Sequence, residues 1–178
     1  MAANQQAPVL CIDGPSGSGK GTITQLVANK LGWAILDSGA LYRLTAISAL
    51  RKSVALDDEP ALAKVAAQLD VEFRSSSPGE PVRVILDGVD VSSELRLETT
   101  GENASKVAVL PEVRAALLQR QRDFAKPPGL VADGRDMASV VFPDALLKLY
   151  LTADISVRAK RRHKQLIEQG FSHTLTAL

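Results

Sequence analysis

The residues best suited to chemistry lie at positions 14–22, with the sequence GPSGSGKGT. Closely spaced glycines let successive backbone N–H groups turn into one concavity, and such a concavity binds an anion. Lys20 adds a positive charge for the β- and γ-phosphates of a nucleotide, and the Thr22 hydroxyl can reach a phosphate or Mg²⁺. A glycine-rich turn without function is the alternative. The apolar run before the loop and the helical pattern after it favour a phosphate-binding loop (P-loop).

A second cluster follows the apolar run at residues 130–133. Asp133 resembles the strand-end carboxylate that holds Mg²⁺ directly or through water in P-loop enzymes. The alternative is an ordinary strand-end Asp before a glycine. The Arg135 guanidinium can bind a phosphate through two parallel hydrogen bonds, and Asp136, which only accepts, can read an amino group or a ring N–H. We therefore expect the second half of the site at these residues.

A third motif, DSGALYR at residues 37–43, lies where a strand is expected to give way to a helix. Ser38 is expected to cap that helix. Arg43 lies about one turn inside it, where the helix dipole disfavours a cation unless an anion is bound nearby. The position of Arg43 therefore predicts a phosphate contact.

A fourth cluster comprises Arg158, Arg161 and Arg162 in a basic helical segment. Spacings of three and four put these arginines largely on one helix face. A solvated cationic face is the ordinary interpretation of such a run. In a kinase the same face closes over the transferring phosphoryl group and neutralises its charge.

The surrounding pattern supplies elements that could position these residues. Short apolar runs predict strands buried in a parallel sheet, and 3.6-residue periodicity predicts helices between them. The expected strands are residues 9–13, 34–37, 130–133 and 146–151, and the expected helices are residues 22–30, 40–52, 59–69, 98–109, 111–125 and 155–169, the last with Gly170 as its C-cap.

Residues 71–74, 82–86 and 89–91 alternate partly between apolar and polar, and Asp87-Gly88 is a strong hairpin signal. We therefore predict an α/β fold: a P-loop NTPase core with a parallel sheet flanked by helices, plus a small antiparallel insert. The expected division is a core at residues 1–59 and 101–178 and a small insert at residues 60–100.

Composition narrows the function classes. The 178 residues carry 21 Lys and Arg against 20 Asp and Glu, a net charge of +1, which is unlike a general nucleic-acid binder. No stretch approaches the length of a membrane span. The single cysteine, Cys11, lies in an apolar run and is expected to be a small buried hydrophobe. Residues 1–7 lack the features of a secretory signal, so a cytoplasmic protein is expected.

Three separated motifs, residues 14–22, 37–43 and 133–137 with VVFPD at 140–144, together resemble the bacterial cytidylate kinase family. The G-K-G-T form of the loop is typical of nucleoside-monophosphate kinases rather than GTPases. The resemblance extends over residues 8–172, and the hairpin region resembles the insert that distinguishes this family. It implies transfer of the γ-phosphoryl of ATP to CMP or dCMP, with Mg²⁺ as cofactor. It also implies a monomer whose insert at residues 60–100 binds the acceptor nucleotide.

The resemblance also implies a set of site residues. ATP would be bound by Gly14, Pro15, Ser16, Gly17, Ser18, Gly19, Lys20, Gly21 and Thr22. The acceptor nucleotide would be bound by Ser38, Arg43, Ser105, Arg114, Arg135 and Asp136. Catalysis would involve Lys20, Arg135, Arg158 and Arg162, and the metal would be held near Thr22 and Asp133.

The chain departs from the family pattern in two places. Ala138-Ser139 stand where the family more often has Gly-Thr, and residues 173–178 do not match the family's longer C-terminal part, which contacts ribose and phosphate. Four core strands are expected against the family's five. We therefore expect a shortened C-terminal end, and ATP binding with strongly reduced turnover if these residues are the whole protein.

Three other functions stay open on the residues alone. One is a P-loop kinase for another small acceptor such as UMP. Another is a GTPase-type switch, although its N-K-x-D pattern is missing, because the sequence after Asn29-Lys30 lacks the Asp. The third is a nucleotide binder with little turnover.

Overall fold

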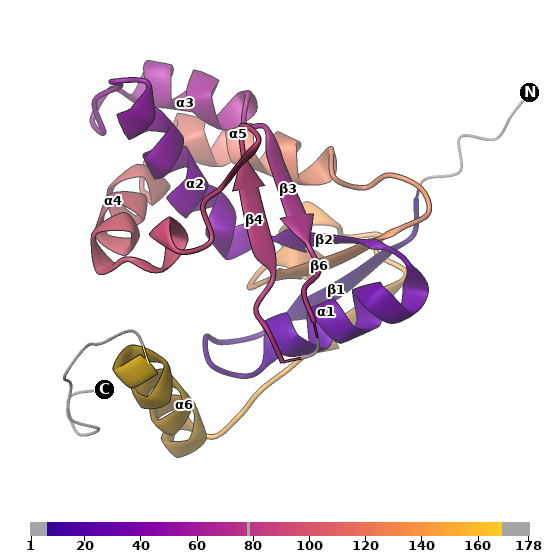
Figure 1. The fold of residues 1–178 in the computed structure, drawn as a ribbon. Coiled ribbons are helices and arrows are strands. Elements are labelled where there is room, and N and C mark those ends of the chain that lie inside the picture. Colours follow the sequence, from indigo (N-terminus) through magenta and orange to yellow (C-terminus); the bar gives the residue numbers. More distant parts are fainter. Residues whose placement is uncertain (1–6, 78, 169–178) are drawn as a thin grey trace, which may run out of the picture.

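A parallel sheet forms the centre of the molecule (Figure 1). The computed structural model describes residues 7–77 and 79–168. The sheet order is β2-β6-β1-β7, and its strands are β1 (Val9–Asp13), β2 (Ala34–Asp37), β6 (Leu130–Gly134) and β7 (Leu147–Tyr150). All three pairings are parallel, with Asp37 opposite Asp133 and Asp13 opposite Gly134. The four predicted core strands are confirmed, and their carboxyl ends meet at one edge.

Six helices of the described residues connect and cover the strands. They are α1 (Lys20–Leu31), α2 (Ser38–Arg51), α3 (Glu59–Ala67), α4 (Glu98–Ala108), α5 (Pro111–Arg122) and α6 (Ile155–Glu168). α1 packs against β6 and β2, while α3 packs on α5 and α4 on α2. Pro111 occupies the first turn of α5 as predicted. The expected C-cap Gly170 lies outside the described residues.

The first turn of α2 corrects one sequence prediction. The capping residue is Asp37, whose carboxylate accepts the backbone N–H of Ala40 at 3.1 Å, so the expected capping role of Ser38 is wrong. Ser38 is instead the first residue of the helix and is buried. A carboxylate is the better cap because it also carries negative charge to the positive end of the helix dipole.

A second, antiparallel sheet of order β3-β4-β5 forms the insert. Its strands are β3 (Val71–Arg74), β4 (Arg83–Leu86) and β5 (Val89–Asp90). Asp87 and Gly88, with φ of 49° and 78°, make the tight turn that the sequence predicts. A 3₁₀ turn, η1 (Glu94–Arg96), then leads into α4.

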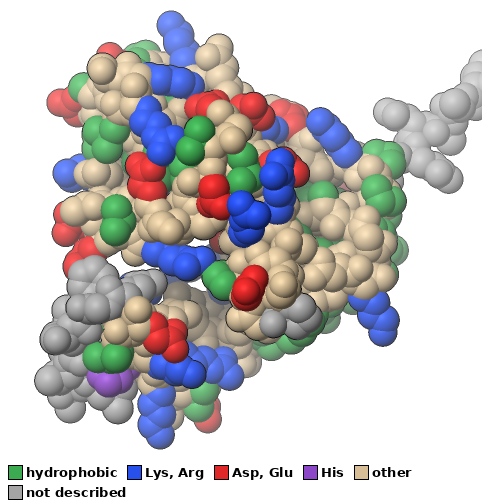
Figure 2. Space-filling model, viewed as in Figure 1, with side chains coloured by type: hydrophobic (Ala, Val, Ile, Leu, Met, Phe, Trp, Pro, Cys, Tyr) green, Lys and Arg blue, Asp and Glu red, His purple; other side chains and the backbone are tan. Residues whose placement is uncertain are grey.

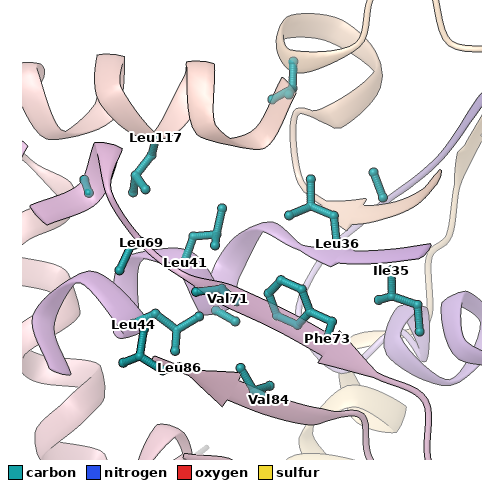
Figure 3. Packing of buried hydrophobic residues seen from close by; sticks show 14 of the residues in the cluster. Ile35, Leu36, Leu41, Leu44, Leu69, Val71, Phe73, Val84, Leu86 and Leu117 are labelled. Atoms are coloured by element: carbon teal, nitrogen blue, oxygen red, sulfur yellow. The ribbon is translucent and has the colours of Figure 1, made fainter. Parts of the chain in front are cut away.

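One hydrophobic cluster joins the insert to the rest of the fold. Figure 3 shows Val71 and Phe73 of β3 packing toward Leu41 and Leu44 of α2. The insert is therefore seated on the same core that supports the parallel sheet. Cys11 is fully buried in that core, and burial is the first cause that raises the pKa of its thiol to about 11. The predicted role of Cys11 as a small hydrophobe is confirmed.

β7 differs from the predicted buried strand. It pairs with β1 alone and forms an edge of the sheet, and all four of its residues are exposed. Leu149 and Tyr150 are 44% and 72% exposed. The apolar composition predicted the strand correctly, but it could not predict that the second edge of this strand has no paired neighbour among the described residues.

Candidate active site

The P-loop runs from the end of β1 to the start of α1, as predicted. Gly14 has φ of +152°, and a Cβ at this position would lie 2.0 Å from the Leu151 carbonyl oxygen. The chain approaches so closely because the Leu151 N–H donates to the Asp13 carbonyl at 2.7 Å, while Gly14 donates to Gly134 at 3.2 Å. A side chain at Gly14 would therefore force the loop away from β6 and β7.

The interior of the loop is arranged for an anion. Gly19 takes a left-handed conformation and starts α1, so the first N–H groups of the helix face the loop. The Lys20 ammonium donates to the Pro15 carbonyl at 2.9 Å, across the loop. The Ser18 hydroxyl is buried without a hydrogen-bond partner. An unsatisfied buried hydroxyl beside a lysine and a helix N-terminus fits a phosphate ligand.

Two carboxylates face each other at the carboxyl edge of the sheet. Asp37 and Asp133 are cross-strand partners, and Asp133 also lies beside Gly21, whose Cβ would be 3.7 Å from its Oδ2. Burial, and then the nearby Asp37 charge, raise the pKa of Asp133 to about 7, although Lys20 opposes the shift. Burial likewise raises the pKa of Asp37, against its backbone hydrogen bonds and the charges of Lys20 and Arg43.

Arg43 lies on the acceptor side of these carboxylates. Its Nη1 donates to the Leu95 carbonyl of η1 at 2.8 Å. Burial is the main cause that lowers the pKa of Arg43, and the second is the positive charge of Arg162 on α6. Two arginines brought near each other from separate elements form a site for an anion between them. The structure thus brings together two residues that the sequence analysis assigned to separate clusters.

A second group forms around Tyr42, which is half-buried on α2. Burial is the largest cause that raises the pKa of the Tyr42 phenol. The nearby charge of Arg114 lowers this pKa, and that of Asp136 raises it. Three elements therefore converge on one place, since Arg114 lies on α5 and Asp136 follows β6. Arg114 and Asp136 are both predicted acceptor residues. The sequence motif contains Tyr42 without a role, and only the folded chain brings it near both of them.

Two other predicted acceptor residues, Ser105 and Arg135, make no hydrogen bond to this group in the part of the chain that the structure describes. The Ser105 hydroxyl donates to the Gly101 carbonyl at 3.0 Å within α4. Gly101 in turn faces the Arg43 guanidinium, which would lie 3.1 Å from a Cβ there. Arg135 is exposed and lines a hollow of about 350 Å³ beside β7, together with Lys148 and Tyr150.

α6 lies against the P-loop and carries the predicted arginine cluster (Figure 1). Arg161 donates through Nη1 to the Gly17 carbonyl at 3.0 Å. Gly17 has φ of +77°, and a Cβ there would lie 3.3 Å from the Arg158 Cβ, so the helix backbone comes directly against the loop. Lys and Arg side chains gather over α6 and along the adjoining margin of the body (Figure 2). Arg161, rather than Arg158 or Arg162, makes the direct hydrogen bond to the loop.

Asp13 is a site-forming residue that sequence reasoning missed. It ends β1 and is only 5% exposed, and its two oxygens accept the backbone N–H groups of Met137 and Ala138, both at 2.9 Å. These bonds start the unexpected π-helical turn η2 (Met137–Val141), which directly follows Arg135 and Asp136. The available signal was an acidic residue ending an otherwise apolar strand.

The comparisons with known proteins agree on one family. The cytidylate kinase family model matches residues 10–178. The cytidylate kinase of Bordetella pertussis strain Tohama I is 58% identical over 178 residues, which is 100% of this chain and 77% of the relative. That of Pseudomonas putida strain W619 is 57% identical over 175 residues, 98% of this chain and 77% of the relative.

The cytidylate kinase of Aeromonas salmonicida strain A449 is 58% identical over 167 residues, which is 94% of this chain and 72% of the relative. Among solved structures, TT1252 from Thermus thermophilus is similar with a TM-score of 0.42 and 21% identity, over 94% of this chain and 75% of that chain. This structural likeness is too distant to bear on function. The family model and the extent of identity to these relatives show that the chain belongs to the cytidylate kinase family.

Proposed function

We propose that this chain performs the family's phosphoryl transfer, from the γ-phosphate of ATP to CMP or dCMP, with the residues described above. The chain is an ATP-dependent nucleoside-monophosphate kinase that produces ADP and CDP or dCDP. The observation that carries the residue assignment is that Arg43 of α2 lies within reach of the positive charge of Arg162 of α6. Their mutual repulsion is relieved when a negatively charged group lies between them, as a transferring phosphoryl group would.

The donor half is proposed to be the P-loop, residues 14–22. Its backbone N–H groups and the N-terminus of α1 bind the phosphates of ATP, and Lys20 exchanges its bond to the Pro15 carbonyl for the β- and γ-phosphates. Arg158 and Arg162 on α6 then contribute charge from the other side. α6 and the P-loop together exclude water, since hydrolysis of ATP competes with transfer.

The acceptor half is proposed to hold CMP from its phosphate to its base. Arg43 and Arg135 bind the acceptor phosphate, while Ser38, Ser105 and Arg114 line the path to the base. Asp136 accepts from the cytosine amino group, because a carboxylate can only accept hydrogen bonds. Its proximity to Tyr42 and Arg114 supports this assignment. The insert, residues 60–100, is proposed to be the acceptor-binding part, against a core of residues 1–59 and 101–178.

The reaction is proposed to be a direct in-line transfer without a covalent enzyme intermediate. The acceptor phosphate oxygen forms a bond to the γ-phosphorus as the bond to the β-phosphate oxygen breaks. The residues of the chain orient both nucleotides and neutralise charge on the transferred group. No described side chain has to form a bond to phosphorus.

The residues at Asp133 fit a Mg²⁺ cofactor. Asp133 and Asp37 repel each other, and a cation beside them would restore the ionised form of Asp133. Within residues 7–77 and 79–168 no group of three or more His, Cys, Asp or Glu is arranged to hold a metal. Mg²⁺ in kinases needs only one or two carboxylates, because phosphates and water supply the other ligands. Asp133 and Thr22 would hold it, and it would neutralise phosphate charge.

All proposed site residues come from one chain, so a monomer suffices and neither nucleic acid nor membrane is required. In the described residues, no helix combines the length and the hydrophobicity that a membrane span requires. A cytoplasmic location is proposed, and the unpaired, buried thiol of Cys11 is compatible with a reducing compartment.

The function is tested by a coupled assay of ADP release with CMP, dCMP, UMP and AMP as acceptors. CMP and dCMP should give the highest kcat/KM. Asp136→Ala should reduce the preference for CMP over UMP by roughly tenfold, the effect of about one charged hydrogen bond. Asp57→Ala, which removes an exposed carboxylate before α3, is the matched control. Equal use of CMP and UMP by the unaltered chain would contradict the proposed acceptor.

A further inference from the structure

One polar side chain joins the P-loop helix to the antiparallel insert. Gln25 lies in α1 and is only 5% exposed. Its Nε2 donates to the backbone carbonyl of Glu80 at 2.9 Å, and its Oε1 accepts the backbone N–H of Ser76 at 3.3 Å. Ser76 and Glu80 lie in the segment that connects β3 to β4. A single amide therefore binds two separate points of this connection.

These two bonds are the hydrogen bonds between α1 and residues 75–82 among the residues that the structure describes. Both go to backbone groups, so the contact depends on the amide of Gln25 and not on the side chains of the insert. The Ser76 hydroxyl is buried at the same joint without a hydrogen-bond partner. A joint that leaves a hydroxyl unsatisfied is not optimised for stability alone.

The other end of the insert reaches the acceptor side. Backbone pairing runs from β3 through β4 to β5, and the Val91 N–H donates to the Val84 carbonyl at 2.9 Å. The Leu95 N–H then donates to the Val91 carbonyl at 2.9 Å, and the Leu95 carbonyl accepts from Arg43. In Figure 1, β3 and β4 run between α1 and the end of their sheet beside α3 and α5. The insert is thus one hydrogen-bonded unit, bound to Gln25 through the β3–β4 connection and to Arg43 through Leu95.

We propose that Gln25 is a positioning residue for the acceptor nucleotide. It fixes the insert against the P-loop helix, so that the turn after β5 holds Arg43 where the acceptor phosphate binds. Gln25 itself touches neither nucleotide. This role rests on the proposed function, because it assigns Arg43 to the acceptor phosphate. Loosening the joint should therefore weaken CMP binding and leave ATP binding nearly unchanged.

Two substitutions separate the parts of the contact. Gln25→Glu keeps the size of the side chain and an acceptor for the Ser76 N–H, but it cannot donate to the Glu80 carbonyl. Gln25→Leu introduces an apolar side chain of similar size and removes both hydrogen bonds. Asn29→Ala is the matched control, because Asn29 is an exposed amide on the same helix. Circular dichroism and thermal melting show whether each variant is folded.

The measurements are the dissociation constants of CMP and of ATP by calorimetry, and hydrogen exchange over residues 71–86. Both Gln25 variants should weaken CMP binding about fivefold, the effect of one net hydrogen bond, and change ATP binding less than about twofold. Exchange at Ser76 should become faster in Gln25→Leu, which removes the acceptor of the Ser76 N–H. Asn29→Ala should behave as the unaltered chain.

Three results would overturn the proposal. One is unchanged CMP binding in variants whose Ser76 amide exchanges faster, because the joint would then be purely structural. Another is an equal loss of ATP and CMP binding, which would indicate a damaged P-loop helix. The last is unchanged exchange at Ser76 in both variants. If the unaltered chain binds ATP but no CMP, the proposed function itself is contradicted. This measurement on the unaltered chain comes before any variant is compared, so the two failures are distinguished.

Discussion

The buried carboxylate of Asp13 allows a quantitative test of how the two halves of the site are held together. Asp13→Asn preserves the shape of the side chain and leaves one oxygen to accept either Met137 or Ala138. The new NH₂ group then faces the remaining backbone N–H, so two donors meet in a buried place. The change removes one charge-assisted hydrogen bond and leaves a buried donor unsatisfied.

The expected loss follows from these two effects. A hydrogen bond to a charged group contributes about 1.5–3 kcal/mol, and relief of the buried charge offsets part of the loss, so about 2–3 kcal/mol is expected. For a chain of this size that lowers the melting temperature by roughly 4–12 °C. Because η2 follows Arg135 and Asp136 directly, KM for CMP should rise about tenfold, while KM for ATP should change far less.

Differential scanning fluorimetry and steady-state kinetics with CMP and ATP varied in turn provide the assay. Asp57→Asn is the control, since Asp57 is exposed and makes no hydrogen bond in the part of the chain that the structure describes. A melting temperature within about 1 °C of the unaltered chain would refute the reasoning about the buried bonds. A lower melting temperature with an unchanged KM for CMP would refute the link from Asp13 to the acceptor residues.

Three further predictions follow from the same geometry. Gly14→Ala places a Cβ 2.0 Å from the Leu151 carbonyl, so ATP binding measured by calorimetry should be lost, whereas Gly79→Ala, with open space around it, should bind normally. The pKa of Asp133 is about 7 in the folded chain, so this carboxyl keeps its proton between pH 4 and 7, where it is ionised in the unfolded chain. The free energy of unfolding should therefore fall by about 1.4 kcal/mol per pH unit over this range. Asp133→Asn, which cannot ionise, should lack this fall when the free energy of unfolding is measured by urea titration. The Cys11 thiol, with a pKa of about 11, should resist iodoacetamide at pH 8 by mass spectrometry until urea unfolds the chain, and rapid labelling of the folded chain would contradict its burial.

The sequence predicts well what depends on neighbouring residues. The glycine spacing of residues 14–22, the apolar strands and the Asp87-Gly88 turn are local patterns, and each forms where it was expected. Helix ends are predicted within a few residues. The capping residue of α2 was misassigned because Asp37 and Ser38 are both good caps, and the choice depends on where the strand β2 ends.

Contacts between distant segments were not predictable in the same way. No local pattern predicts that Asp13 binds backbone groups more than 120 positions away, or that Gln25 forms hydrogen bonds with the insert. The π-helical turn after Asp136 exists because Asp13 binds its first N–H groups, so it too depends on the assembled sheet. Exposure of β7 likewise depends on which strands pair with it.

Three contacts that sequence reasoning missed share one chemical feature. Asp13, Gln25 and Arg161 each bind a backbone group of another segment, respectively η2, the β3–β4 connection and the P-loop. Backbone groups carry no sequence signature, so these partners cannot be recognised from residue types. All three contacts lie on β1, α1 or the loop between them. The P-loop and its flanking elements, for which phosphate binding is proposed, therefore also contact the turn η2, the insert and α6.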